Sequence, residues 1–180
     1  MTIPEAAAPK TLTDALDNMA QAIRSLHSRE ATGALAALRR LDVDHPVDPA
    51  FHALLAGSVP YHLFAETGEL DAMTRRFARV AQIMALKPDH LGGKPLGRVL
   101  SAIRALERPL AMLLNAQGPT LDDLIRRAAR RIALSEEPLP YRDLGLLILY
   151  SGRRRDVEKL DELRLRIARD FRRAARDAEK

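Results

Sequence analysis

The chain has 180 residues, 47% of them apolar, and carries 29 Lys and Arg against 24 Asp and Glu, a formal net charge of +5; this is the size of one globular domain. It contains no cysteine, which excludes disulfides, zinc ribbons, iron–sulfur clusters and thiol nucleophiles. No apolar run approaches the roughly 18 residues of a membrane span and no secretory signal pattern is present, so we expect a cytoplasmic protein that contacts no membrane.

The N-terminal part of the chain divides into a tail and a first helix. Residues 1–12, which are rich in Ala and Pro, are predicted to form a flexible tail, and residues 13–180 a single helical domain. From Thr13 onward, apolar residues recur at spacings of three and four, which is typical of an amphipathic helix. The predicted inward face of this helix is Leu16, Met19, Ala20, Ile23 and Leu26.

The rest of the chain also has a helical period, and no stretch shows β-type alternation over several cycles. Proline and glycine separate the helical segments, and the linker 88–95, which contains Gly92 and Gly93, is predicted to be a surface loop. The sequence therefore predicts an all-α fold, a compact single-domain bundle of about eight helices. The further helical segments are expected at about 32–41, 51–56, 70–86, 96–106, 107–116, 120–134, 141–150 and 155–176.

Charge is distributed unevenly along the chain. Residues 1–90 carry 9 basic and 11 acidic side chains, whereas residues 91–180 carry 20 and 13, which gives the second half a net charge of +7. Of the 29 cations, 24 are arginines, whose planar guanidinium group suits bidentate contacts with phosphate. A GC-rich genome produces the same bias without any function, so the position of each arginine decides its meaning.

The predicted helix 120–134 separates apolar from basic residues most clearly. Thr120 is expected to begin it, with its hydroxyl accepting a hydrogen bond from the backbone N–H of Asp123. At about 100° per residue, four arginines share one arc of roughly 140°. These are Arg126, Arg127, Arg130 and Arg131. Asp122 and Asp123 lie one turn before the first two and can neutralise them, whereas the last two have no acidic partner one turn earlier. A free basic face is therefore predicted.

Other basic residues repeat this pattern. The predicted helix 70–86 carries Arg75, Arg76 and Arg79 on an arc of roughly 100° opposite its apolar residues. The cations around and after the glycine-containing linker are Lys94, Arg98, Arg104 and Arg108. Each arginine taken alone is as readily a solvated surface residue, but basic stripes on several helices together indicate a phosphate-binding surface.

The predicted C-terminal helix, 155–176, differs because its arginines alternate with acidic residues. That mixture is typical of a solvent-exposed face crossed by salt bridges, and we predict no binding site on it. A short basic run, Arg153, Arg154 and Arg155, precedes this helix. These side chains could hold phosphate, or they could satisfy the last carbonyl groups of the preceding helix.

Residues that would support catalysis are not gathered in the sequence. The five histidines fall in different segments without an HExxH motif, Gly92-Gly93-Lys94 lacks the spacing of a P-loop, and no serine lies in a GxSxG motif. We therefore predict no catalytic residue, no metal and no cofactor. Because the chain has no tryptophan and few other aromatic residues, nucleic acid would be bound through its backbone without reading of base sequence.

Several short motifs occur in the order found in one known family. In the second half these are Leu96-Gly97-Arg98, Ser101, Leu106-Glu107-Arg108, Leu113-Leu114 and Leu139-Pro140-Tyr141-Arg142-Asp143-Leu144. Upstream, the segment from Gly33 forms a predicted helix that ends in Arg39 and Arg40. Over roughly residues 30 to 175 the chain resembles the CasB family, the small subunit of the type I-E CRISPR complex Cascade. Tyr150 stands where that family usually has tryptophan.

The resemblance implies an all-α, non-catalytic subunit that acts in antiviral defence. Such a subunit is present as two head-to-tail copies beside other Cascade subunits, where it helps to hold the CRISPR RNA (crRNA), the target DNA strand and the displaced strand of the R-loop. Together with the three arginines of the 70–86 helix, the candidate nucleic-acid contacts are Arg39, Arg40, Lys94, Arg98, Arg108, Arg126, Arg127, Arg130 and Arg131. The alternative is a helical scaffold or regulator that binds protein only.

Overall fold

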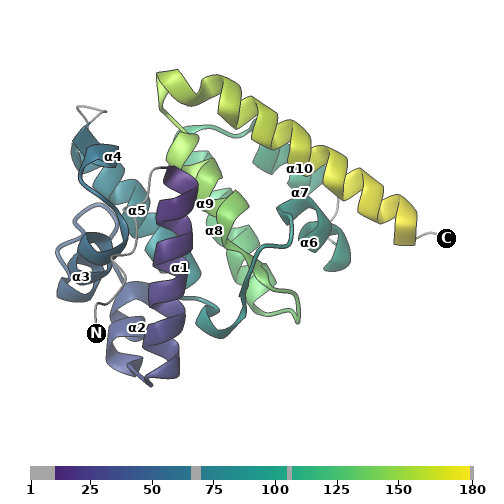
Figure 1. Cartoon of the computed structure of the whole chain (residues 1–180). Helices are drawn as coiled ribbons and strands as arrows, with labels where there is room; N and C mark the ends of the chain where they lie inside the picture. Colours follow the sequence, from purple (N-terminus) through teal and green to yellow (C-terminus); the bar gives the residue numbers. More distant parts are fainter. Residues whose placement is uncertain (1–10, 66–69, 105–106, 179–180) are drawn as a thin grey trace, which may run out of the picture.

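The structure is a computed structural model that describes residues 11–65, 70–104 and 107–178. Most of the predicted tail, residues 1–10, lies outside this described part. The described helices pack into one body, so the all-α, compact fold is confirmed (Figure 1). The α-helices are α1 (Leu12–Ser28), α2 (Thr32–Arg39), α3 (Pro49–Ser58), α4 (His62–Ala65), α5 (Leu70–Met84), α6 (Leu96–Ala102), α7 (Glu107–Asn115), α8 (Gly118–Ala133), α9 (Tyr141–Tyr150) and α10 (Val157–Ala178).

Helix α1 begins one residue earlier than predicted, because Thr11 caps it. The Thr11 hydroxyl accepts a hydrogen bond from the backbone N–H of Asp14 at 3.1 Å, and the Asp14 carboxylate accepts one from the Thr11 N–H at 3.0 Å. The predicted inward face is buried, with Leu26 at its edge. Asp17 accepts two hydrogen bonds of 2.7 Å from Arg142 of α9, and this contact raises the pKa of that guanidinium above its usual range. Helix α1 is therefore joined to α9 by both apolar and charged contacts.

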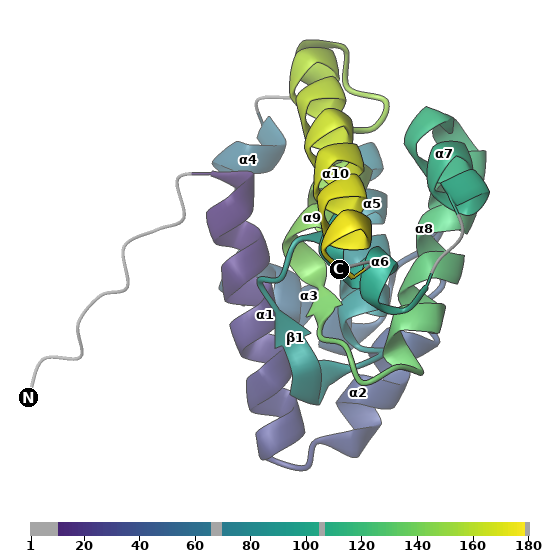
Figure 2. The ribbon, with the colours of Figure 1, turned by 90° about the vertical axis from the view of Figure 1, so that its right-hand side faces the viewer.

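Helix α9 lies in the middle of the molecule and is buried on nearly every side (Figures 1 and 2). It contacts α1, α5, α8 and α10. Gly145 allows a close approach to α1, since a Cβ atom at that position would stand 2.6 Å from Cδ2 of Leu16. A helix that is apolar all round belongs in the interior, and α9 forms the centre of the hydrophobic core.

A two-residue parallel pairing was not predicted. Strands β1 (Leu91–Gly92) and β2 (Leu139–Pro140) lie side by side, and two residues are too few to show an alternating pattern in a sequence. A Cβ atom on Gly92 would come within 2.6 Å of the Cβ of Pro138, so this approach requires glycine. The linker 88–95 is thus held against the segment that precedes α9.

Helices α6 and α10 cross closely at Gly97. A Cβ atom at this position would clash with the backbone oxygen of Ile167 and would lie 2.7 Å from the backbone nitrogen of Phe171. Helix α6 ends at Ala102, earlier than predicted, because Arg104 has a φ of 51° and so leaves the right-handed helical region. The crossing fixes the position of α10 over α6.

The buried carboxylate of Asp143 joins three helices. It belongs to α9 and accepts a hydrogen bond of 2.8 Å from the backbone N–H of Leu96, the first residue of α6. Arg166 of α10 donates a second hydrogen bond to it at 2.7 Å. One carboxylate therefore satisfies an N–H group that the helix itself leaves unpaired and holds α10 in place.

Candidate nucleic-acid interface

The arginines predicted on one face of α8 lie on a helix that begins earlier than expected. It starts at Gly118 with Pro119 in its first turn, and the N-cap residue Gln117 makes no side-chain cap. Proline fits there because its missing N–H group needs no partner in the first turn. The prediction that Thr120 begins and caps the helix is therefore wrong. The opposite side of α8 is buried through Leu121, Ile125, Ala129 and Ile132.

Two of the four arginines on this face have no partner in the described part of the chain. Arg126 pairs with Asp123 at 2.8 Å, and Arg131 donates a hydrogen bond of 3.5 Å to a backbone carbonyl group. Arg127 and Arg130 are exposed and form no ion pair or hydrogen bond with another described residue. We call these two residues the α8 arginine pair. Arg126 is neutralised as expected, but by Asp123 and not by Asp122, which leaves Arg127 without an acidic partner among the described residues.

Asp122 turns away from α8 and faces α5. Its carboxylate lies 3.9 Å from the guanidinium of Arg79. Arg75, Arg76 and Arg79 line one hollow of about 450 Å³, and Asp44 and Asp122 line the same hollow. The structure therefore brings the predicted arginines of α5 together, but it places two carboxylates among them. This lowers the positive charge that the hollow presents to an anion.

Burial changes the protonation of Asp122. It raises the pKa of this carboxyl above its usual value, and the guanidinium groups of Arg79 and Arg76 oppose the shift. Because the pKa is higher in the folded chain than in the unfolded chain, the folded state holds the proton more tightly. The contribution of this carboxyl to stability is therefore greatest at low pH and is lost as the pH rises through its folded pKa.

Replacing Asp122 by asparagine should remove this dependence on pH. The free energy of unfolding of the wild type, minus that of Asp122→Asn, should fall as the pH rises from below the ordinary pKa of an aspartate toward neutrality. Urea denaturation at several pH values measures this difference, with Asp177→Asn, which alters an exposed aspartate of α10, as the control. A difference that increases with pH would mean that the arginines of α5 outweigh the burial.

The other predicted contacts divide into structural and exposed side chains. Arg39 donates a hydrogen bond of 2.6 Å to the carbonyl of Ala85, just after α5, and Lys94 pairs with Glu137 at 2.5 Å. These two cations therefore hold segments of the fold together. The exposed candidates without an ion pair or hydrogen bond to a described residue are Arg40, Arg98 and Arg108.

Two of the three arginines in the basic run before α10, Arg153 and Arg155, contact Asp156 within the fold. Arg153 and Asp156 form a buried ion pair at 2.7 Å, with side chains that are only 5% and 4% exposed. Lys159 reaches the same carboxylate at 3.2 Å. The side chain of Arg153 is therefore neutralised inside the protein and is not available to phosphate.

The C-terminal half of α10 differs in its ion pairs from the part that precedes it. Salt bridges are present earlier in the helix, where Arg164 pairs with Asp161 at 3.3 Å. The arginines of the last turns form no ion pair with a described residue, so the prediction of a face crossed by salt bridges is wrong there. The Cβ of Asp170 packs beside Gly97 at the crossing with α6, and the Asp170 carboxylate forms no ion pair with a described residue. The unpaired side chains are Arg169, Arg172, Arg173 and Arg176.

Within the ranges that the structure describes, no group of three or more His, Asp or Glu side chains is placed to hold a metal ion. In the same part of the chain, every helix is too short or too polar to cross a membrane.

Comparisons with known proteins gave one match. No curated protein and no solved structure matches the chain. The sequence model of the family described as CRISPR-associated protein Cse2, which is the CasB family, matches residues 34–171. This range includes the α8 arginine pair, the crossing of α6 with α10 and the first part of the unpaired stretch of α10, and it leaves out α1. Because the match covers well over half of the chain, the protein belongs to the Cse2 family of CRISPR-associated proteins.

Proposed function

We propose that this protein is the non-catalytic small subunit of a type I-E Cascade complex and that its α8 arginine pair contacts the phosphate backbone of the bound nucleic acids. Membership of the Cse2 family implies the small-subunit role. The observation that supports the contact is the exposure of Arg127 and Arg130, which no described residue neutralises. Free guanidinium groups on an outer face favour phosphate, since each provides a planar fork of donors.

The character of this surface favours contact with backbone over reading of bases. The exposed positions in the second half of α8 are arginine, helix α8 carries no aromatic residue, and the exposed aromatic side chain of Tyr61 lies in the segment between α3 and α4. Stacking on bases requires an aromatic ring at the contact. We therefore expect binding that does not depend on base sequence, as a subunit that stabilises R-loops of many different targets requires.

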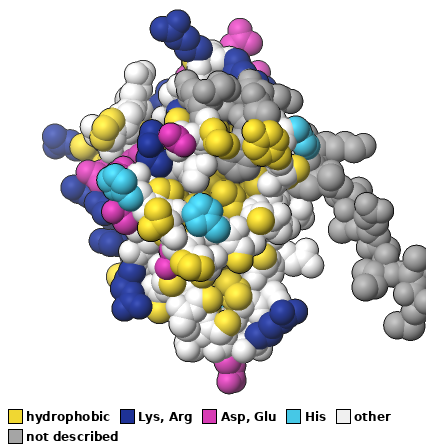
Figure 3. Space-filling model, turned by 90° about the vertical axis from the view of Figure 1, so that its left-hand side faces the viewer, with side chains coloured by type: hydrophobic (Ala, Val, Ile, Leu, Met, Phe, Trp, Pro, Cys, Tyr) yellow, Lys and Arg dark blue, Asp and Glu magenta, His cyan; other side chains and the backbone are white. Residues whose placement is uncertain are grey.

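The partners that follow from this role are the other Cascade subunits, a second copy of the chain, the crRNA, the target strand and the displaced strand. One observation also favours contact with protein: Val47, shortly before α3, and Tyr61, directly before α4, are 81% and 73% exposed. Figure 3 shows the side of the molecule that includes α3 and α4, with hydrophobic side chains in the middle of the view, histidines across it and most Lys and Arg toward its edges. A protein-only scaffold would use this face and leave the arginines solvated.

The affinity for nucleic acid at different salt concentrations tests the proposal. The isolated protein should bind a labelled 20-nucleotide oligo(dT) weakly, and its affinity should fall steeply between about 50 and about 200 mM salt, because each phosphate contact releases counterions. Fluorescence anisotropy measures this dependence. From its source, the protein should also co-purify with crRNA and several subunits. Co-purification of the same subunits without any RNA, together with binding that salt does not change, would identify the protein as a protein-only scaffold.

A further inference from the structure

We infer that the last turns of α10 form a second phosphate-binding site, separate from the α8 arginine pair, for the backbone of a nucleic-acid strand. The site consists of Arg169, Arg172 and Arg176, which we call the α10 arginine stripe. At about 100° per residue, these three positions fall within roughly 60° of one another on the helix. They therefore present three guanidinium groups in a row along one side of α10.

The α10 arginine stripe is exposed, and no described acidic residue pairs with it. All three side chains are accessible to solvent, and none has an ion pair with a described residue. Arg169 donates one hydrogen bond of 3.4 Å to the carbonyl of Leu165, one turn earlier in the same helix, which leaves its charge free. Arg164 and Arg166, earlier in α10, are each paired with an aspartate. The change from paired to unpaired arginines therefore occurs within one helix.

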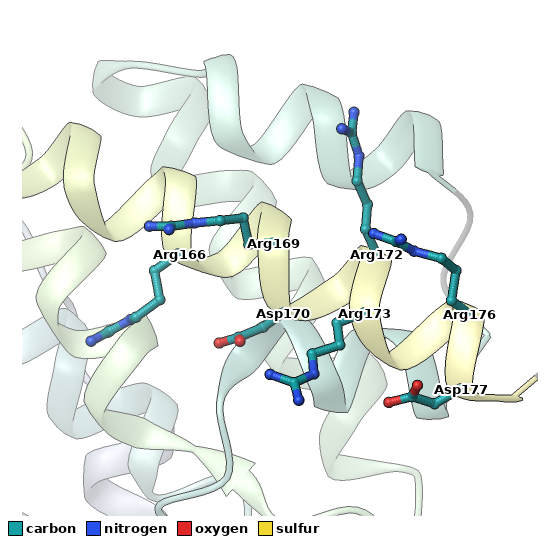
Figure 4. A pocket seen from close by; sticks show the side chains of 7 residues that line it. All are labelled: Arg166, Arg169, Asp170, Arg172, Arg173, Arg176 and Asp177. Atoms are coloured by element: carbon teal, nitrogen blue, oxygen red, sulfur yellow. The ribbon is translucent and has the colours of Figure 1, made fainter.

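The acidic residues near the stripe point to another side of the helix. Figure 4 shows Arg172 and Arg176 on one side of α10 and the carboxylates of Asp170 and Asp177 on the other, with Arg173 between those two carboxylates. These arginines and aspartates line an open hollow of about 770 Å³, larger than the one beside α5. Five arginines and two aspartates line this hollow, so its charge is positive, and an anion on the side of α10 that carries Arg172 and Arg176 meets guanidinium groups first.

The helix dipole explains only part of this distribution of charge. Cations at the C-terminal end of a helix are favoured, but the effect is confined to the last turn, and the last turn of α10 holds Arg176 alone. Arg169 and Arg172 lie further back, beyond the reach of that effect. Upstream on the same side stand Glu158, Asp161 and Glu162, so the positive surface has a defined limit.

The stripe is distinct from the α8 arginine pair. Figure 2 shows α10 at the centre of that view and α8 toward its right-hand edge. Helix α7 contacts both of them, and it carries the exposed Arg108 in its first turn. No aromatic side chain of α10 is exposed, because its Phe171 is buried. The site therefore suits consecutive phosphates and provides no platform for bases.

This inference rests on the proposed function and adds a second surface to it, outside the α8 arginine pair. Replacing two arginines of the stripe by an uncharged residue tests it. In the full-length chain, Arg172→Gln with Arg176→Gln should weaken binding of the labelled oligo(dT) several-fold. The slope of log affinity against log salt should become shallower by about 1.4, at about 0.7 for each lost contact on a single strand. The matched control is Arg29→Gln with Arg154→Gln, which removes the same charge from exposed arginines elsewhere.

The outcomes separate this inference from the proposed function. Thermal melting first shows that the three variants, including Arg127→Gln with Arg130→Gln, are folded. If the α8 variant loses affinity and the α10 variant behaves as the control, the second site is overturned and the proposed function stands. If both behave as the control, both nucleic-acid contacts are overturned. If the α10 variant keeps its affinity for oligo(dT) but loses binding of poly-glutamate, the stripe is a site for an acidic protein and the inference is wrong.

Discussion

Replacing Arg127 and Arg130 by glutamate should weaken R-loop formation by the assembled complex by roughly 10- to 100-fold. A hydrogen bond to a charged group contributes about 1.5 kcal/mol or more, and each 1.4 kcal/mol corresponds to a factor of ten in affinity. Two lost contacts therefore account for about 100-fold, and other subunits that hold the same strands reduce the effect. Electrophoretic mobility shifts of target DNA with the reconstituted complex measure this loss.

The fold should tolerate this double substitution. Both side chains are exposed on the outer face of α8, and neither is bonded to another described residue. Glutamate is also a good helix former. The melting temperature and helicity of the isolated variant should therefore match those of the wild type, so a loss of R-loop formation reports on the contact and not on stability.

A charge-matched variant completes this test. Arg29→Glu with Arg154→Glu changes the net charge by the same amount, at exposed positions outside α8 and outside the last turns of α10. It should retain nearly full R-loop formation, because surface charge far from the strands acts only through the screened long-range field. If the two double variants lost equal amounts of activity, net charge would explain the effect and the α8 arginine pair would not be a contact.

Helical periodicity predicted much of this fold, because the buried face of a helix consists of apolar residues at spacings of three and four in the sequence. The apolar spacing after Thr13 predicted the inward face of α1, and the limits expected for α9, residues 141–150, agree with the structure. The β1–β2 pairing and the start of α8 at Gly118 could not be found in that way. Pairing depends on segments that are distant in the sequence, and a first turn that contains Pro119 has no apolar stripe.

The site was harder to predict because the partner of an arginine is often remote in the sequence. Asp122 is one turn from Arg126, yet its carboxylate lies beside Arg79 of another helix. The guanidinium of Arg39 is held by the carbonyl of Ala85. Local spacing shows which charges can meet within a helix, but tertiary packing decides which of them do.

In the C-terminal half of α10, an ion pair that the local spacing favours does not form. Asp170 is three residues before Arg173, a spacing that favours an ion pair within a helix. At the crossing with α6, however, its Cβ lies 2.9 Å from the position that a Cβ of Gly97 would occupy. Its carboxylate forms no ion pair with a described residue, and the arginines beside it have no acidic partner among the described residues. Spacing within the helix therefore did not predict the charge of this surface.

Replacing Gly97 by alanine should destabilise the protein by about 3 kcal/mol, at the upper end of the usual cost of overpacking. The added methyl group would meet the backbone oxygen of Ile167 and the backbone nitrogen of Phe171, and neither atom can rotate away as the end of a side chain can. Relief requires α10 to move away from α6, which would strain the hydrogen bond between Arg166 and Asp143. Urea denaturation should show a lower midpoint than that of the wild type.

The matched control for this prediction is Gly33→Ala in α2, where an added Cβ meets no atom within 4 Å. Alanine in an open helical position is expected to be neutral or to stabilise by about 0.5–1 kcal/mol. Because α10 carries the arginine stripe, Gly97→Ala should also weaken oligo(dT) binding at temperatures where the variant remains folded, whereas Gly33→Ala should not. Equal urea midpoints for Gly97→Ala and Gly33→Ala would show that α6 and α10 do not cross as closely as Gly97 indicates. Normal oligo(dT) binding by folded Gly97→Ala would show that the crossing does not position the α10 arginine stripe.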